Sequence, residues 1–95
     1  MRSPEGFEKI AIKRYLDSIK VWHFSPYMAG FGKSGVPDII ACLDGIFVGI
    51  EVKREGKEPT VLQDMRMAEI KDSAGFATWG AAERVIPILK KLPYE

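Results

Sequence analysis

The feature that most constrains the fold is the dipeptide Asp44-Gly45, which lies between two apolar runs. Asp-Gly in this setting is the strongest short-range signal for a β-hairpin, because the mirror-image turn that it forms matches the right-handed twist of the flanking strands. Residues 38–43 are therefore predicted to pair with residues 46–51 in antiparallel fashion.

This hairpin is predicted to bring two carboxylates together at its open end. With a two-residue turn, Asp38 lies directly opposite Glu51, and their Cβ atoms are roughly 5 Å apart. Like charges in this position destabilise a sheet, so a positive group is expected between them. Side chains alternate along a strand, which places Lys53 on the same face. The opposite face is expected to be core, made of Ile39, Ala41, Leu43, Ile46, Val48, Ile50 and Val52.

The first helix is expected to begin at Ser3 and Pro4, because serine is a favoured N-cap and proline a favoured first helical residue. Its buried stripe is predicted to contain Glu8, Ile12, Tyr15 and Ile19. A carboxylate on a buried stripe needs a partner, so Glu8 is a candidate functional residue.

The remaining segments predict two strands and two helices around the hairpin. Thr60 and Gln63 match a capping box, which opens a helix, and Gly75 is expected to supply its left-handed stop. Pro87 is expected to kink or divide the last helix. In order, the predicted elements are a strand at 21–24, the hairpin, a helix from Thr60 to about residue 73 or 74, a strand at 76–79 and a helix at 81–92. The chain is thus expected to be an α/β protein with a mixed sheet, whose last strand is reached by a helical crossover.

Length and composition indicate one small domain spanning residues 1–95, of ordinary globular character, with 46% hydrophobic and 28% charged residues. The single cysteine, Cys42, excludes an intramolecular disulfide, suits a reducing compartment and is expected in the core or the site wall. Residues 1–10 show no signal peptide, and the longest apolar run, 39–43, is too short for a membrane span. We therefore expect a cytoplasmic chain without a membrane partner, in a bacterial host if it is phage-encoded.

The net charge of +1 neither requires nor excludes a polyanionic partner. Local clusters of basic side chains are compatible with a phosphate track, although each is equally compatible with a solvated surface. They are Lys9, Lys13, Arg14, Lys20, Lys33, Lys53, Arg54 and Lys57.

The paired acids suit a hard divalent cation, since Mg²⁺ typically takes one or two protein carboxylates and keeps waters and phosphate oxygens as its other ligands. Asp38 and Glu51 supply that pair, and the Val52 carbonyl is a third ligand if the strand end bends toward the metal. Lys53 places an ammonium near an attacking water or the reacting phosphate. The implied chemistry is metal-assisted hydrolysis of a phosphodiester.

With these residues in place, the chain resembles the PD-(D/E)xK nuclease superfamily and, within it, the VRR-NUC (virus-type replication-repair nuclease) domains. The resemblance covers nearly the whole chain and rests on Glu8, Gly35-Val36-Pro37-Asp38, Gly49-Ile50-Glu51-Val52-Lys53 and Thr60-Val61-Leu62-Gln63, in that order. It implies a restriction-endonuclease-like αβββαβ core with a mixed central sheet, followed here by a C-terminal helix.

The resemblance also implies roles for individual residues. Asp38, Glu51, the Val52 carbonyl and Glu8 would hold Mg²⁺ or Mn²⁺, Lys53 would assist the nucleophilic water, and Gln63 and Glu8 would complete the catalytic site. Glu5 is an alternative to Glu8 as the glutamate of the first helix. Stand-alone VRR-NUC proteins resemble Holliday junction resolvases, which implies a homodimer that cuts branched DNA.

Several alternatives remain open. The chain is compatible with a catalytically silent nucleic-acid-binding or dimerisation module on a nuclease scaffold, or with the same chemistry in restriction-like or flap cutting. Gln63 is compatible with a purely capping role, and Glu8 with a simple ion pair to a lysine. A set of apolar side chains too large for so small a core is expected to form a subunit contact or to stack on DNA bases, and we favour the subunit contact. These are Trp22, Phe24, Tyr27, Met28 and Phe31.

Overall fold

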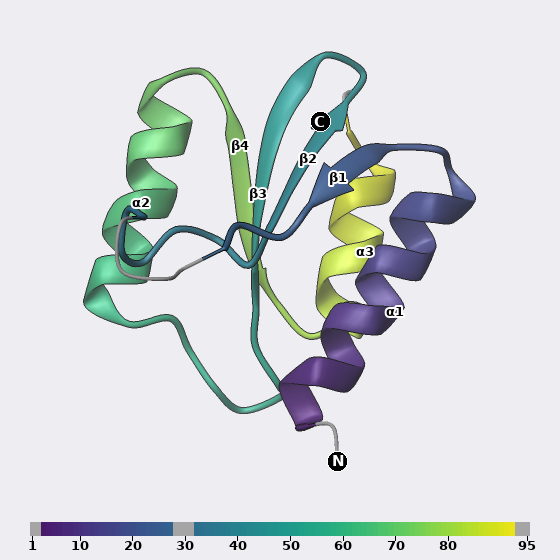
Figure 1. Ribbon diagram of the computed structural model, residues 1–95, viewed down its shortest axis with the longest axis horizontal. Coiled ribbons are helices and arrows are strands. Elements are labelled where there is room, and N and C mark those ends of the chain that lie inside the picture. The colour runs from purple at the N-terminus through teal and green to yellow at the C-terminus, as the bar shows by residue number, and fades with distance from the viewer. Residues whose placement is uncertain (1–2, 28–31, 93–95) are drawn as a thin grey trace.

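The computed structural model describes residues 3–27 and 32–92 of the chain. Three helices and four strands follow in the order predicted from the sequence (Figure 1). They are α1 (Pro4–Ser18), β1 (Trp22–Phe24), β2 (Ile39–Leu43), β3 (Ile46–Val52), α2 (Val61–Asp72), β4 (Phe76–Gly80) and α3 (Ala82–Lys90). None of the helices in the described ranges is long and apolar enough to cross a membrane.

The four strands form one mixed sheet in the order β1-β2-β3-β4. The first three strands are antiparallel, and β4 joins parallel to β3 after the α2 crossover, as predicted. The hairpin turn is confirmed: both Asp44 (φ 52°) and Gly45 (φ 83°) have positive φ, as the mirror-image turn requires. Leu43 pairs with Ile46, and the register therefore matches the one derived from the turn.

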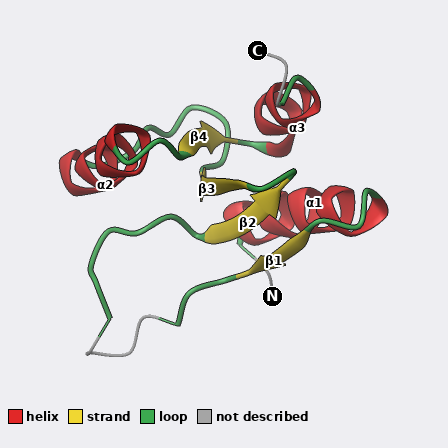
Figure 2. Cartoon of the chain, turned by 90° about the horizontal axis from the view of Figure 1, so that it is seen from above, coloured by secondary structure: helices red, strands yellow, loops and turns green. Residues whose placement is uncertain are grey.

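The core lies on one face of the sheet, under α1 and α3, whereas α2 lies against the other face (Figure 2). Both helices contribute i, i+4 pairs of aliphatic side chains to it, and the strands contribute alternate residues. The buried core consists of Ile12, Leu16, Ile39, Ala41, Leu43, Val48, Ile50, Val52, Val85 and Leu89. The predicted core face of the hairpin is thus confirmed, with Ile46 partly buried at its margin.

The α2 face is only partly covered, because α2 contacts β3 and β4. On the β1 and β2 side of this face Ile40 is buried, whereas several other side chains are exposed. We call the exposed surface formed by Trp22, Phe24, Cys42 and Phe47 the open half-sheet; Trp22 pairs with Cys42, which pairs with Phe47. The expectation that Cys42 lies in the core or site wall is wrong, since its side of β2 has no helix over it. Two other residues of the expected apolar set, Met28 and Phe31, lie outside the described residues.

The buried stripe of α1 differs from the prediction at its end. Ile12 and Leu16 are fully buried, whereas Ile19 is 43% exposed. The helix ends at Ser18, and Ile19 is its C-cap, so its side chain no longer follows the helical spacing that placed it on the stripe. Ser3 accepts a hydrogen bond from the Gly6 N–H, which confirms the predicted start of this helix.

The end of α2 also corrects a prediction. The left-handed residue is Ala74 (φ 68°) and not Gly75. The N–H of Gly75 donates to the Ile70 carbonyl at 2.9 Å, and a Cβ at Gly75 would lie 2.8 Å from Cγ2 of Ile70 and 3.1 Å from the Phe47 carbonyl oxygen. Glycine is needed there because helix and strand approach closely, and not because of its backbone conformation.

Pro87 does not divide α3, which is continuous from Ala82 to Lys90. Proline removes the N–H that would bind the carbonyl four residues earlier, at Glu83. Both Glu83 and Pro87 are exposed, so water can satisfy that carbonyl.

Candidate active site

Asp38 and Glu51 meet where the hairpin opens. Ile39 pairs with Ile50 at the end of the β2–β3 ladder, so the next position outward sets Asp38 opposite Glu51. The backbone N–H of Val52 donates a hydrogen bond of 2.8 Å to Oδ2 of Asp38. This bond fixes the Asp38 carboxylate against β3 although the residue itself lies just outside β2.

Glu51 is only 2% exposed, and its environment strongly disfavours its charge. Burial raises its pKa most, followed by a hydrogen bond with Asp38 and by the negative charge of that carboxylate. The Lys53 ammonium opposes this shift, whereas Glu5 adds to it, and together they raise the pKa of Glu51 from 4.5 to about 9. At neutral pH and without a cation, Glu51 therefore keeps its proton.

One oxygen of Glu51 has no donor. Oε1 is buried and accepts no hydrogen bond from the described residues, whereas Oε2 accepts one from Gln63. A hydrogen bond between Glu51 and Asp38 requires a proton on one of the two carboxyl groups. A proton shared between the two carboxyl groups relieves their repulsion without a cation, and a cation relieves it without the proton. The proton stabilises the pair, and a divalent cation in its place would do the same.

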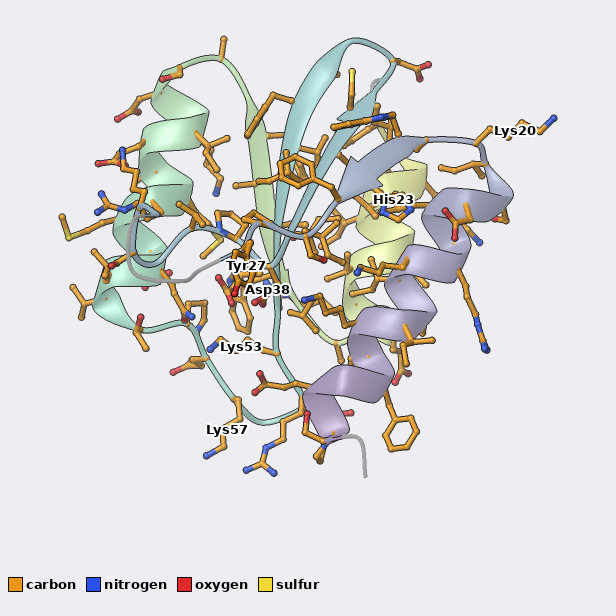
Figure 3. The ribbon with its side chains drawn as sticks, in the orientation of Figure 1. Lys20, His23, Tyr27, Asp38, Lys53 and Lys57 are labelled. Carbon is orange, nitrogen blue, oxygen red and sulfur yellow. The ribbon has the colours of Figure 1, made fainter. Side chains whose placement is uncertain are left out.

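Lys53 directly follows β3, and its backbone is fixed to β4 by a hydrogen bond of 3.0 Å from its N–H to the Gly80 carbonyl. Its ammonium acts on the pKa of Glu51, so this positive charge is close enough to the acid pair to matter electrostatically. Figure 3 shows Lys53 near Asp38, in the region between α1 and α2. The structure thus brings together the three hairpin residues that the sequence singled out.

Gln63 serves two purposes at once. The side-chain Oε1 of Gln63 accepts a hydrogen bond from the backbone N–H of Thr60 (2.9 Å). The backbone N–H of Gln63 donates to Oγ1 of Thr60 (3.2 Å), which completes the predicted capping box. Because the cap uses the amide oxygen, the amide nitrogen is left to donate to Oε2 of Glu51 at 3.2 Å. The capping and site interpretations of Gln63 are therefore compatible.

Glu8 is placed elsewhere. Its Oε1 accepts a hydrogen bond of 2.8 Å from the N–H of Ala82, the first residue of α3. The N-cap of that helix is Ala81, which has no side-chain acceptor to offer, so Glu8 caps α3 from α1. Glu5, in the first turn of α1, is the glutamate whose charge reaches Glu51.

A metal ion at this site would meet a pair of acids. Within residues 3–27 and 32–92, no three His, Cys, Asp or Glu side chains lie close enough together to hold a metal ion. Two carboxylates, one with a donor-free oxygen, nevertheless suit Mg²⁺ or Mn²⁺, which complete their shell with carbonyls, waters and phosphate oxygens. The carboxylate oxygens of Asp38 and Glu51 together therefore fit the expected Mg²⁺ or Mn²⁺.

Two residues beside the site were not expected from the sequence. Trp79 pairs with Glu51 across β3 and β4, so both side chains lie on the α2 face. The Arg84 guanidinium lies over the Trp79 ring, with Cζ 4.2 Å from its centroid. Only the parallel register places Trp79 here, and no local sequence signal encodes that register.

Comparison of the chain with protein family models, curated proteins and solved structures finds no match.

Proposed function

We propose that this protein is a Mg²⁺- or Mn²⁺-dependent endodeoxyribonuclease of the PD-(D/E)xK type, with a restriction-endonuclease-like core and VRR-NUC character. One observation carries the proposal: the buried carboxyl of Glu51 lies against the half-buried carboxylate of Asp38, next to the Lys53 ammonium. An acid pair of this kind is costly without a positive partner, and perturbed titration is concentrated at functional sites.

In this proposal each residue of the candidate site has a defined role. Asp38 and Glu51 bind the cation, with the Val52 carbonyl as a further ligand, and Gln63 orients Glu51. Lys53 holds a positive charge near the attacking water and the phosphate. A bound divalent cation would supply a water of lowered pKa and neutralise charge on the phosphate. Glu5 is better placed than Glu8 for a supporting role, because Glu8 is bound to Ala82.

The substrate we propose is branched DNA, such as a Holliday junction, recognised mainly through its backbone, in the cytoplasm. The decisive experiment compares wild type, Lys53→Ala and Asp38→Asn on plasmid and four-way-junction DNA with Mg²⁺ or Mn²⁺. We expect both variants to lose at least about 100-fold in cleavage rate, because they remove transition-state charge stabilisation or a metal ligand.

Lys71→Ala is the matched control, since Lys71 is an exposed lysine in the last turn of α2. It should cleave at the wild-type rate. Full activity of Lys53→Ala would remove Lys53 from the mechanism, and absence of cleavage by the wild type on every DNA would contradict the nuclease proposal. Flap and restriction-like substrates in the same assay decide between the cutting modes.

The second candidate is a catalytically silent nucleic-acid-binding or dimerisation module. It is favoured by the presence of only a pair of acids, and not a triad, in the described part of the chain. Calorimetric titration with Mn²⁺ separates the two candidates, because a silent module need not bind metal. Binding by the wild type that is lost in Asp38→Asn supports the nuclease.

We also propose a homodimer that buries the open half-sheet. Trp22 is 66% exposed and its ring lies 5.4 Å from that of Phe24, which makes a contiguous apolar surface. Light scattering should show a dimer for the wild type and a shift toward monomer for Trp22→Ser. Val61→Ser is the control, because Val61 is an apolar residue on α2 that is 79% exposed and lies outside the open half-sheet. A monomeric wild type would contradict the dimer.

A further inference from the structure

A pocket lies at the end of the sheet where β3 and β4 both finish. Its volume is about 450 Å³, and its walls come from the loop after β3, the end of β4 and the start of α3. Trp79, which lines it, is the parallel-strand neighbour of Glu51. Neighbouring strands lie about 4.8 Å apart, so a ligand that spans the two strands touches both sites.

Arg84 is held in this pocket by three contacts. Its guanidinium lies over the Trp79 ring, and its Nε donates a hydrogen bond of 2.9 Å to the Trp79 carbonyl. Gly80 lies beneath the side chain: a Cβ there would be 2.6 Å from Cδ of Arg84, and its φ of +135° also disfavours other residues. The absence of a side chain at Gly80 lets Arg84 cross the end of the strand.

The terminal nitrogens of Arg84 are free to bind a ligand. In the described part of the chain they make no hydrogen bond or ion pair, and Nε alone is engaged. A guanidinium whose orientation is already fixed loses little freedom on binding, and its planar fork matches two oxygens of a phosphate. Stacking on tryptophan adds to the rigidity of the group.

The charge around the pocket favours one discrete contact. Arg84, Arg54 and Lys57 line it together with three glutamates, Glu55, Glu58 and Glu83, so the formal charge of the lining is balanced. A balanced lining does not attract polyanions in general. An anion is bound there only if it makes direct contact with the prearranged guanidinium.

We propose that Arg84, held over Trp79, binds the phosphodiester adjacent to the one at the acid pair. The proposal rests on the nuclease function proposed above and adds a strand-positioning subsite to it. A nucleic-acid strand that places one phosphate at Asp38 and Glu51 extends its next phosphate toward β4 and Arg84. The subsite thus determines which bond of the strand is presented for cleavage.

The test measures binding of a fluorescein-labelled four-way junction by anisotropy, in EDTA, at several salt concentrations. Arg84→Ala should weaken binding about 10-fold, the effect of losing a charge-assisted contact, and reduce the slope of log affinity against log salt by about 1. Arg84→Lys should recover only part of the affinity, since lysine keeps the charge but not the fork. In cleavage, Arg84→Ala should raise KM more than it lowers kcat.

Lys90→Ala is the matched control, because Lys90 is on the same helix with its ammonium 5.9 Å from the Tyr15 ring centroid, but does not line the pocket. It should change neither affinity nor salt slope. If Arg84→Ala has the same affinity and salt slope as this control while the wild type cleaves DNA, the proposed subsite is wrong. The nuclease proposal is then unaffected. Binding that depends on Arg84 without any cleavage supports the subsite and contradicts the nuclease.

A competition arm identifies the source of the phosphate. A deoxynucleoside monophosphate should displace the labelled junction only at millimolar concentrations, because it supplies one contact of many. Displacement at micromolar concentrations that is lost in Arg84→Ala would assign the pocket to free nucleotides and overturn the strand contact.

Discussion

Near its end, the two faces of β3 are almost equally buried but differ in the chemistry of their surroundings. Ile50 and Glu51 are neighbours in the strand and are almost equally inaccessible, at 0% and 2% exposed. Ile50 faces an apolar core closed by α1 and α3, whereas Glu51 faces another carboxylate under the edge of α2. The core face therefore stabilises the fold, whereas the other face carries the candidate site, whose acid pair lowers the stability.

The largest effect is expected on the core face. Ile50→Ala should lower the free energy of unfolding by about 2–5 kcal/mol, because it removes buried methyl groups and leaves a cavity. Urea unfolding followed by circular dichroism measures this loss. A loss below about 1 kcal/mol would show that this face is less tightly closed than the contacts of Ile50 indicate.

On the site face, metal affinity should depend on pH. Both carboxylates must be ionised to hold a divalent cation, and the pKa of Glu51 near 9 means that its proton must leave on binding. Mn²⁺ affinity measured by calorimetry should therefore increase with pH, by up to about 100-fold between pH 6 and 8, or about 2.7 kcal/mol. Affinity that does not change over this range would contradict a protonated Glu51 in the free protein.

Without metal, Glu51→Gln should raise the free energy of unfolding, whereas Ile50→Ala lowers it. Glutamine keeps an acceptor for Gln63 and offers Asp38 a donor, without the buried charge. The folded protein binds one more proton than the unfolded chain between pH 4.5 and 9, so the Glu51 carboxyl lowers stability as pH rises through this range. The stability of Glu51→Gln relative to the wild type should therefore increase by up to about 1.4 kcal/mol for each unit by which the pH rises. Thermal unfolding in EDTA at several pH values measures this difference. A constant difference would contradict the raised pKa.

The smallest effect is expected on the open half-sheet. Phe47 is 50% exposed, so Phe47→Ala should lower the free energy of unfolding by about 1 kcal/mol or less in dilute protein. The measurement is urea unfolding at two protein concentrations. A loss that grows with concentration would show that Phe47 is buried between two copies of the chain.

Local sequence signals predicted the elements because their physics is local. The Asp44-Gly45 turn, the Thr60 capping box and the Ser3 cap each depend on residues a few positions apart. The hairpin register follows from the turn, so the meeting of Asp38 and Glu51 was also predictable. Two predictions failed where a helix ended: Ile19 lies beyond the end of α1, and Ala74 takes the conformation expected of Gly75. A third failed inside β2, where Cys42 is exposed.

The sequence by itself determined the order of elements, the core face of the hairpin and the acid pair beside Lys53. Only the tertiary structure decided that Glu8 caps α3, that Gln63 reaches Glu51, that Trp79 pairs with Glu51 and that Arg84 lies over Trp79. These contacts join residues from different elements, and their partners are set by how helices pack on the sheet and how β4 aligns with β3. Local spacing constrains a turn or a cap, but it carries no information about which distant segment will be its neighbour.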